Sequence, residues 1–366
     1  MQQPQNNTHE NYAEFIEKTI ASRYQIKMFI GSGGMGIVFK GFDAKLNRVV
    51  AIKVVNLKSF NEGKKQRLIN EAHAIAQLNH TYIIQVYDIV EEEGRGYIVM
   101  QYVDGLNFEE LLKSNTFTWK QIATIVKNIA LAMFYAHKKG LVHRDIKTSN
   151  ILISAKENRC YLMDFGLVAN IQNDTRLTPE GAIIGTPDFM SPEQAQGQGI
   201  DNRSDIYSLG VVMYEALTKK RCVNASNSFA AIMQIVQEHP EKPREINSEI
   251  PEMLEEICLK AMKKNREERY QTAMDMVKHL EGFLLQQKKE SEEGLEAHEI
   301  QEKKTQIIDL SKTKKNKALS RNKNTGRIRK SKKYARKHRK SQSQYAGIWI
   351  VIICLFIIIL IISNLT

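Results

Sequence analysis

Hydrophobic residues in the first hundred positions follow the two-residue period of β-strands. Residues 24–30 alternate between apolar and polar side chains, and residues 37–40 continue as a β-type run after a cluster of glycines. Residues 48–55 and 97–105 contain apolar runs that are typical of strands, the second of which ends in a turn. The pattern therefore predicts that the first part of the chain is rich in β-structure.

Later in the chain, the apolar residues recur at helical spacing. Residues 119–139 carry one apolar stripe and predict an amphipathic helix that ends at Gly140. Residues 205–217 are apolar around nearly the whole circumference, which predicts a central buried helix. Further amphipathic helices are predicted over residues 253–263 and 272–284.

Both ends of the chain depart from this pattern. Residues 1–20 are polar and then weakly amphipathic, so we expect an N-terminal extension with a short helix packed on the domain edge. Residues 286–345 are rich in Lys, Glu, Ser and Asn and predict a disordered linker. Residues 346–362 carry no charge and would measure roughly 26 Å as a helix. They predict a transmembrane helix, followed by a short extracytoplasmic end at residues 363–366.

Charge separates the tail from the rest of the chain. The formal net charge is +12, but residues 311–340 hold fifteen Lys or Arg and no acidic residue. Residues 1–310 hold 38 basic and 41 acidic residues, a net charge of −3. Because the basic block lies only on the N-terminal side of the apolar segment, that side is predicted to be cytoplasmic. We expect a single-pass membrane protein whose residues 311–340 bind anionic lipids. Nucleic-acid binding is disfavoured, since Tyr334 is the only aromatic residue of the block.

A glycine-rich stretch lies between the first two predicted strands. Gly31, Gly33 and Gly36 give a G-x-G-x-x-G pattern, whose backbone N–H groups can approach phosphates where side chains would clash. The same pattern opens dinucleotide-binding folds, but a helix follows at once in those folds. Here residues 37–40 continue as a strand, so we interpret the glycines as a hairpin turn.

A lysine and a glutamate occupy positions where charge is costly. Lys53 lies within the apolar strand at residues 49–55, and Glu71 lies on a helical stripe with three apolar residues. A carboxylate on such a stripe is unfavourable unless it meets a cation. The alternatives are a solvated lysine on an edge strand and a glutamate at the edge of the stripe. With the glycine turn nearby, we favour a Lys53–Glu71 pair that orients the lysine on phosphates.

Polar residues are concentrated again between positions 141 and 164. Asp145, Lys147 and Asn150 lie in a short loop closed by an apolar run, and Asp164 follows a second apolar run. Carboxylate and amide oxygens from the two ends of a hairpin suit a divalent metal beside a phosphate chain. The first segment reads His-Arg-Asp-x-x-x-x-Asn and the second Asp-Phe-Gly, with Asp145 free to accept a hydroxyl proton.

With these motifs in this order, residues 24–285 resemble a eukaryotic-like (Hanks-type) serine/threonine protein kinase, closest to the bacterial membrane-anchored class. The resemblance implies an α+β fold with two lobes over residues 21–285, a β-rich N-lobe and a helical C-lobe. It implies transfer of the γ-phosphoryl group of ATP to Ser or Thr of protein substrates, including autophosphorylation, with Mg²⁺ or alternatively Mn²⁺. It also leaves a homodimer open. The alternative function is that of a membrane-tethered pseudokinase scaffold.

The resemblance also assigns the site residues. Asp145 would accept the hydroxyl proton, Lys147 would neutralise the γ-phosphate, and Asn150 and Asp164 would hold the metal. The backbone of residues 101–103 would bind the adenine edge. The residues expected to line the nucleotide site are Ile30, Gly31, Ser32, Gly33, Gly34, Met35, Gly36, Val38, Ala51, Lys53, Met100, Gln101, Val103, Asn150, Leu152 and Asp164.

The stretch between Asp164 and Glu193 resembles an activation segment, which indicates a protein substrate. Glu193 would pair with a buried Arg269, and Asp205 would brace the backbone of the catalytic loop. Thr186 resembles the threonine that contacts the catalytic aspartate and lysine. The regulatory candidates are Arg144, as a phosphate partner, and the phosphate acceptors Thr175 and Thr178. We expect the dependence on loop phosphorylation to be partial.

Overall fold

The computed structural model describes residues 12–33, 36–57, 60–114, 116–165, 187–225 and 227–290. These residues belong to one compact unit, residues 1–291. The predicted features outside the described residues are the transmembrane helix 346–362, the end 363–366, the linker beyond residue 290, Gly34, Met35, Thr175, Thr178 and Thr186. Among the described residues, no helix is both long enough and apolar enough to cross a bilayer.

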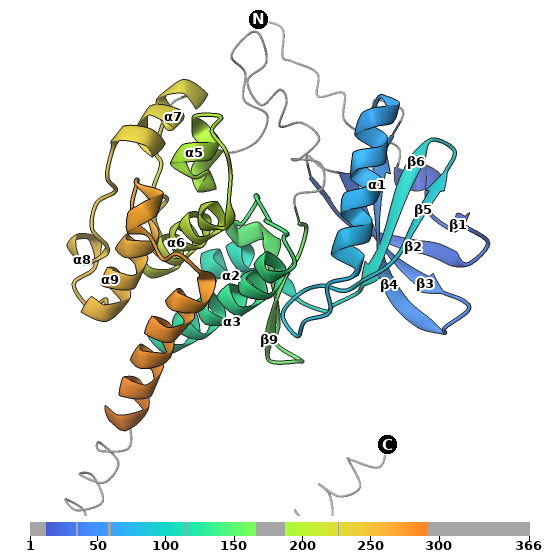
Figure 1. Ribbon diagram of the computed structural model, residues 1–366. Coiled ribbons are helices and arrows are strands. Elements are labelled where there is room, and N and C mark those ends of the chain that lie inside the picture. Colours follow the sequence, from blue (N-terminus) through green and yellow to red (C-terminus); the bar gives the residue numbers. More distant parts are fainter. Residues whose placement is uncertain are drawn as a thin grey trace, which may run out of the picture. The chain divides into compact units, whose positions relative to one another are not determined.

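A six-stranded antiparallel sheet forms the N-lobe (Figure 1). Its strands lie in the order β1-β2-β3-β4-β6-β5. Their bounds are β1 (Thr19–Ile20), β2 (Tyr24–Gly33), β3 (Gly36–Asp43), β4 (Arg48–Asn56), β5 (Val86–Glu92) and β6 (Arg95–Gln101). The strands predicted from the alternation of apolar residues are therefore confirmed, and β2 and β3 form the expected glycine hairpin.

Helix α1 (Glu62–Ala76) packs against β5 of this sheet (Figure 1). Asn61 caps its N-terminus, because the side chain accepts the backbone N–H of Lys64. Leu68, Ala72 and Ile75 are buried on the side that faces the core. The helical stripe read from the sequence is thus the packing face of α1.

The N-terminal segment belongs to the N-lobe, which corrects the predicted domain start at residue 21. A short 3₁₀ helix, η1 (Tyr12–Glu14), leads into Phe15 and into β1, which pairs with β2. Phe15 and Ile20 are buried in a core with residues of β2, β3 and β4. The short helix that we expected at the domain edge is present, and its aromatic side chains cover one face of the sheet.

The C-lobe consists of helices and one small antiparallel sheet (Figure 1). The helices are α2 (Phe108–Ser114), α3 (Trp119–Lys138), α5 (Pro192–Ala195), α6 (Asn202–Thr218), α7 (Ser228–Gln237), α8 (Pro243–Ile246) and α9 (Glu252–Ala261). The short elements are the 3₁₀ helices η2 (Thr148–Asn150), η3 (Pro187–Phe189) and η4 (Arg266–Glu268), and the strands β7 (Leu106–Asn107), β8 (Ile151–Ser154) and β9 (Arg159–Leu162). The β-rich N-lobe and the helical C-lobe confirm the prediction of a bilobal α+β fold.

Helix α6 is the centre of the C-lobe, as its apolar circumference predicts. Nearly all of its residues are buried, and it contacts both α3 and α9. Gly210 permits the approach to α9, because a Cβ there would lie 2.9 Å from the Cβ of Ala261. The larger hydrophobic core joins these helices to α1 and β4.

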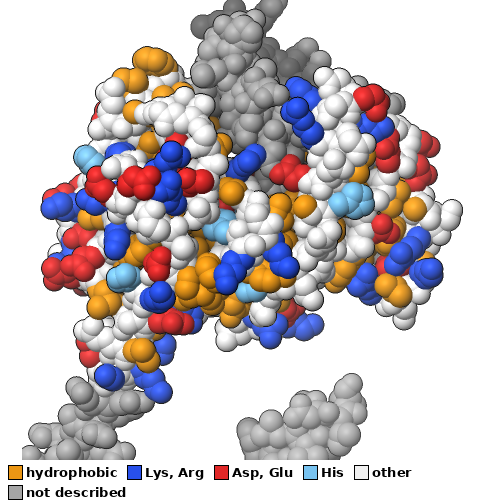
Figure 2. Space-filling view, viewed as in Figure 1, with side chains coloured by type: hydrophobic (Ala, Val, Ile, Leu, Met, Phe, Trp, Pro, Cys, Tyr) orange, Lys and Arg blue, Asp and Glu red, His pale blue; other side chains and the backbone are white. Residues whose placement is uncertain are grey.

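The last described helix covers residues 273–290 and therefore extends five residues past the predicted linker start at 286. The prediction of a helix over residues 272–284 is confirmed in position but was too short. On the visible face of the molecule, Lys and Arg are interspersed with Asp and Glu (Figure 2). This distribution agrees with the nearly balanced charge of residues 1–310.

Candidate active site

A buried aspartate of helix α6 holds the loop that precedes β8. Asp205 accepts the backbone N–H groups of His143 and Arg144, each at 2.8 Å, through its two carboxylate oxygens. The ring of His137, on α3, lies 2.8 Å from the same carboxylate. Arg144 has a φ of 65°, a conformation that is costly for a residue with a side chain and needs surrounding contacts to persist. Asp205 thus has the bracing position that the sequence indicated.

Three predicted site residues meet in this loop. The side-chain amide of Asn150 donates to the backbone oxygen of Asp145 at 2.8 Å and to its carboxylate Oδ2 at 3.0 Å. The Nζ atom of Lys147 lies 2.8 Å from the same Oδ2. Asn150 is buried and part of η2, so it holds Asp145 in one orientation. The carboxylate therefore stands between a fixed amide and a cation.

Asp164 joins the site from the end of β9. Its Oδ1 lies 2.8 Å from the Nζ atom of Lys53, which is buried on β4. Burial opposes the charged form of Asp164, but the attraction and hydrogen bond of Lys53 outweigh it and lower the pKa of the carboxyl. Asp164 also has a left-handed φ of 56°, so a second strained residue lies at this site.

The predicted Lys53–Glu71 ion pair is not formed among the described residues, and this prediction is corrected. Lys53 pairs with Asp164 instead. Glu71 is half-buried on α1, and burial raises its pKa to about 7, an effect that the charge of Arg144 partly opposes. The two pKa shifts follow from this arrangement, because Lys53 stabilises the charge of Asp164 and leaves Glu71 buried without that cation.

His143 packs in the loop and is not placed as a base. Its Nε2 lies 3.0 Å from the backbone oxygen of Met163, and its ring packs on Phe165 at 4.6 Å. Burial lowers the pKa of His143, which favours the neutral ring.

Asn150 and Asp164 present the oxygens that could hold a divalent cation. Asn150 uses its amide nitrogen for both bonds to Asp145, so its amide oxygen is directed elsewhere and can serve as a ligand. Asp164 uses Oδ1 for Lys53 and has a second oxygen. Mg²⁺ prefers such hard oxygen ligands, takes few from the protein and completes its shell with water and phosphate. No cluster of three or more His, Cys, Asp or Glu suited to a metal occurs among the described residues.

The residues expected around a nucleotide share one face of the N-lobe sheet. Val38 lies opposite Lys53, and Ala51 is two residues from Lys53 along β4, so all three side chains face the same way. Gly36 has a φ of 135°, and a Cβ there would lie 2.2 Å from the backbone oxygen of Val54. The third glycine of the pattern is therefore required by the close approach of β3 and β4.

The segment proposed to bind the adenine edge is only partly available. The N–H of Gln101 already donates to the backbone oxygen of Gln85 at 2.8 Å. Met100 and Val103 are buried on either side of it, and Leu152 lies in β8. Any contact of this segment with a base must therefore use the Gln101 oxygen or the backbone at residues 102–103.

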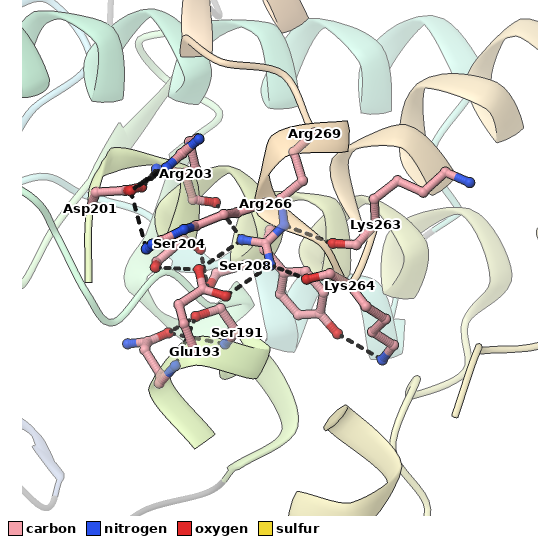
Figure 3. Close-up of polar contacts among 12 residues, drawn as sticks. Ser191, Glu193, Asp201, Arg203, Ser204, Ser208, Lys263, Lys264, Arg266 and Arg269 are labelled. Atoms are coloured by element: carbon pink, nitrogen blue, oxygen red, sulfur yellow. Dashed lines mark hydrogen bonds and ion pairs between the residues drawn. The ribbon is translucent and has the colours of Figure 1, made fainter. Parts of the chain in front are cut away.

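The Glu193–Arg269 pair suggested by the sequence is present and buried (Figure 3). The guanidinium binds both carboxylate oxygens, at 2.7 and 2.8 Å, and Ser204 donates to the same carboxylate at 2.5 Å. The remaining guanidinium N–H groups donate to backbone oxygens of Lys263, Lys264 and Arg203. Burial alone would raise the pKa of Glu193, but Arg269 and Ser204 lower it. The pair ties α5 to α6 and to η4.

The sequence analysis did not predict several contacts that position the catalytic loop. Gln194 donates to the backbone oxygen of Arg144 at 2.9 Å and so links α5 to the catalytic loop. Its spacing from Ser191 forms a capping box, a signal that could have been found in the sequence. Thr148 donates to Glu215 of α6 at 3.1 Å, and no local pattern predicts that contact.

Arg221 forms another contact that the sequence did not predict. Its guanidinium pairs with Asp188 of η3 and lies 3.5 Å from Glu109 of α2. These residues are far apart in the sequence, and both acids look like ordinary surface residues there. The contact connects η3 to α2 in the C-lobe.

Comparison with known proteins identifies the class. The fold, with its N-lobe sheet, helical C-lobe and polar loop between α3 and β8, is that of a protein kinase domain. The family model described as "Protein kinase domain" matches residues 24–280. The chain belongs to the protein kinase family, which confirms the resemblance to Hanks-type serine/threonine kinases.

The relatives are bacterial serine/threonine-protein kinases. PknB of Mycobacterium leprae is 38% identical over 70% of this chain and 42% of its own length. PknB of Mycobacterium tuberculosis is 37% identical over the same shares. A probable serine/threonine-protein kinase of Clostridium perfringens is 35% identical over 73% of this chain and 39% of its own length. The chain thus spans about two fifths of the length of these relatives.

A solved structure supports the fold. The kinase domain of Mycobacterium tuberculosis PknI, in a cysteine-to-alanine variant, matches with a TM-score of 0.59 at 22% identity. The match covers 73% of this chain and 97% of that chain.

Removing the arginine of the buried pair should strongly destabilise the C-lobe. Arg269→Ala leaves the Glu193 carboxylate buried without its cation, so the free energy of unfolding should fall by about 3–5 kcal/mol. Urea unfolding at pH 7 measures the loss. Arg266→Ala is the control, because this partly exposed residue lies 3.5 Å from Asp201, and it should cost less than about 1 kcal/mol. Equal losses for both variants would contradict the role of the buried pair.

The raised pKa of Glu71 predicts a pH-dependent stability. The folded state binds the Glu71 proton more tightly than the unfolded chain does, so this residue lowers the free energy of unfolding as pH rises from about 4.5 to about 7. Glu71→Gln cannot ionise and should be more stable than the wild type at pH 8, with a smaller difference at pH 5. Urea unfolding across this range, with the exposed Glu256→Gln as control, measures the effect. Parallel curves for wild type and Glu71→Gln would disprove it.

Proposed function

We propose that this chain is an active kinase that transfers the γ-phosphoryl group of MgATP to Ser or Thr of protein substrates and of itself. The observation that carries the proposal is a pair of contacts: Lys53 of the N-lobe lies 2.8 Å from Asp164, and Asp145 lies within hydrogen-bonding distance of both Asn150 and Lys147. Family membership and the bacterial serine/threonine kinase relatives support it.

The geometry supports a specific division of labour. Asp145 accepts the proton of the substrate hydroxyl as that oxygen forms its bond to the γ-phosphorus and the bond to the β-phosphate oxygen breaks, releasing ADP. Asn150 keeps the carboxylate oriented through its amide, and Lys147 places positive charge beside it. Asn150 and Asp164 would hold Mg²⁺, which supplies positive charge that offsets the charge of the phosphates.

During this reaction Lys53 could pair with either of two acidic residues, Asp164 or Glu71. In the structure its ammonium binds Asp164, which would also be a metal ligand. We infer that Lys53 would turn towards Glu71 and the α- and β-phosphates if Asp164 served as a metal ligand. The pKa of Glu71 near 7 means that its charged form becomes available at neutral pH.

A pseudokinase scaffold is the alternative function. Scaffolds of this kind lack one or more of the catalytic lysine, aspartate and asparagine, and this chain has all of them. The contacts of Asn150 and Lys147 with Asp145 also favour turnover. Regulation through Arg144, Thr175 and Thr178 and a homodimer remain inferences from the resemblance.

Membrane tethering is a further part of the proposal and rests on the sequence. Residues 346–362 would anchor the chain with its kinase domain in the cytoplasm, and residues 311–340 would bind anionic lipid. The full chain should then stay with membranes after alkaline carbonate washing, whereas a chain ending at residue 345 should be released at high salt. Release of the full chain by carbonate alone would contradict the anchor.

The function itself is tested by label transfer. With γ-labelled ATP and Mg²⁺, the wild type should label Ser or Thr, and Asp145→Asn should lower the rate by about 10²–10⁴-fold because the proton acceptor is lost. Asp275→Asn, a surface substitution on helix 273–290, is the matched control and should keep the wild-type rate. Phosphoamino-acid analysis identifies the labelled residue. ATP binding without label in any variant would favour the scaffold.

A further inference from the structure

Strand β2 twice departs from regular pairing just before the glycine turn. Its register with β3 shifts between Ile26 and Met28 and again between Phe29 and Gly31. Each β-bulge inserts a residue without a partner on the neighbouring strand and interrupts the ladder. The end of β2 that leads into the turn is therefore held less firmly by β3 than a regular strand would be.

The first bulge determines the face on which Phe29 lies. Regular alternation from Ile26 would place Phe29 on the face that carries Lys53, because side chains alternate between the two faces of a strand. With the shift, Phe29 lies opposite Phe39 on the other face, and their rings meet edge-on at 6.2 Å. The second bulge restores the alternation, so Gly31 lies opposite Val38 on the Lys53 face.

The N-terminal segment covers Phe29 on that opposite face. The ring of Tyr12 stacks on Phe29 with centroids 4.6 Å apart and planes 14° from parallel. Phe15 packs on Phe39 at 5.3 Å. The four rings thus contact one another in series, with Tyr12 at one end and the buried Phe15 at the other.

The segment that carries Tyr12 is anchored away from the glycine turn. Arg95, the first residue of β6, binds Glu14 at 2.8 Å, and its guanidinium lies 4.6 Å from the ring centroid of Phe15. Lys18 binds Glu93 at 2.5 Å in the turn before β6. The segment that carries Tyr12 is therefore held by β6 and its preceding turn and, through β1, by the start of β2, which lies ahead of both bulges.

We propose that Tyr12 is a positioning residue for the nucleotide, because its stack on Phe29 holds the doubly bulged end of β2 and with it the glycine turn at residues 31–36. Without the stack, the segment from Met28 to Gly33 can return to regular pairing, which reverses the faces of Met28 and Phe29 and moves the partner of Gly31 from Val38 to Gly36. This inference rests on the proposed function, since it assumes that the turn binds the phosphates of ATP.

The test measures nucleotide binding and turnover separately in the full chain. Tyr12→Ala should raise the Kd for N-methylanthraniloyl-ATP with Mg²⁺, and the KM for ATP, by about two- to tenfold, the range expected for loss of an aromatic pair. The kcat should stay at the wild-type value, because Asp145 and its partners lie in the other lobe. A general loss of structure would lower kcat as well.

Two matched variants separate the stack from stability. Tyr12→Phe keeps the ring without the hydroxyl and should bind nucleotide like the wild type. Ala13→Ser changes the exposed neighbouring residue of the same 3₁₀ helix without touching the ring, and it should also leave the Kd unchanged. If Tyr12→Ala does not fold, Tyr12→Leu is measured in its place, because leucine keeps apolar bulk but cannot stack.

Each outcome decides the question. An unchanged Kd for Tyr12→Ala, a raised Kd for Tyr12→Phe, or an equal effect of Ala13→Ser would overturn the role of Tyr12. If the wild type binds no nucleotide at all, the proposed function itself fails. Because binding is measured without phosphoryl transfer, an inactive chain that still binds ATP tests the inference equally well.

Discussion

The catalytic loop depends on one carboxylate buried in the centre of the C-lobe. Asp205 on α6 would be costly there without donors, and the two backbone N–H groups of His143 and Arg144 supply them. The contact stabilises both partners. The N–H groups of the loop satisfy the buried charge of Asp205, and the Asp205 carboxylate holds Arg144 in a strained conformation. Since α6 is packed between α3 and α9, the position of the loop is fixed by the core.

A second buried acid has a similar role further along the chain. Glu193 is satisfied by Arg269, whose remaining donors bind backbone oxygens. Breaking such a pair is costly because the partner left behind is buried and charged. The C-lobe therefore joins its loops to α6 by paired charges, and Gln194 extends that connection to the backbone of Arg144.

The ion pair that Lys53 forms between the lobes is less permanent than these buried pairs of the C-lobe. Lys53 binds Asp164, and Glu71, half-buried on α1, does not have that cation as its partner. Asp164 is held charged, whereas burial favours the protonated form of Glu71 up to about pH 7. The site thus combines a rigid catalytic loop with a lysine whose partner depends on charge, which suits a residue that has to accommodate a nucleotide and a metal.

The sequence alone determined the kinds of elements, the order of the motifs and the class of protein, because periodicity and short-range spacing are local properties. It also indicated the pairs of Glu193 with Arg269 and of Asp205 with the catalytic loop, through the family pattern. Only the tertiary structure decided that Lys53 binds Asp164 rather than Glu71, because that choice depends on burial and on distances between lobes. Likewise, only the tertiary structure showed that residues before position 21 pack into the N-lobe. The stack of Tyr12 on Phe29 follows from the first bulge in β2, and the sequence does not reveal this bulge because residues 28–30 are all apolar.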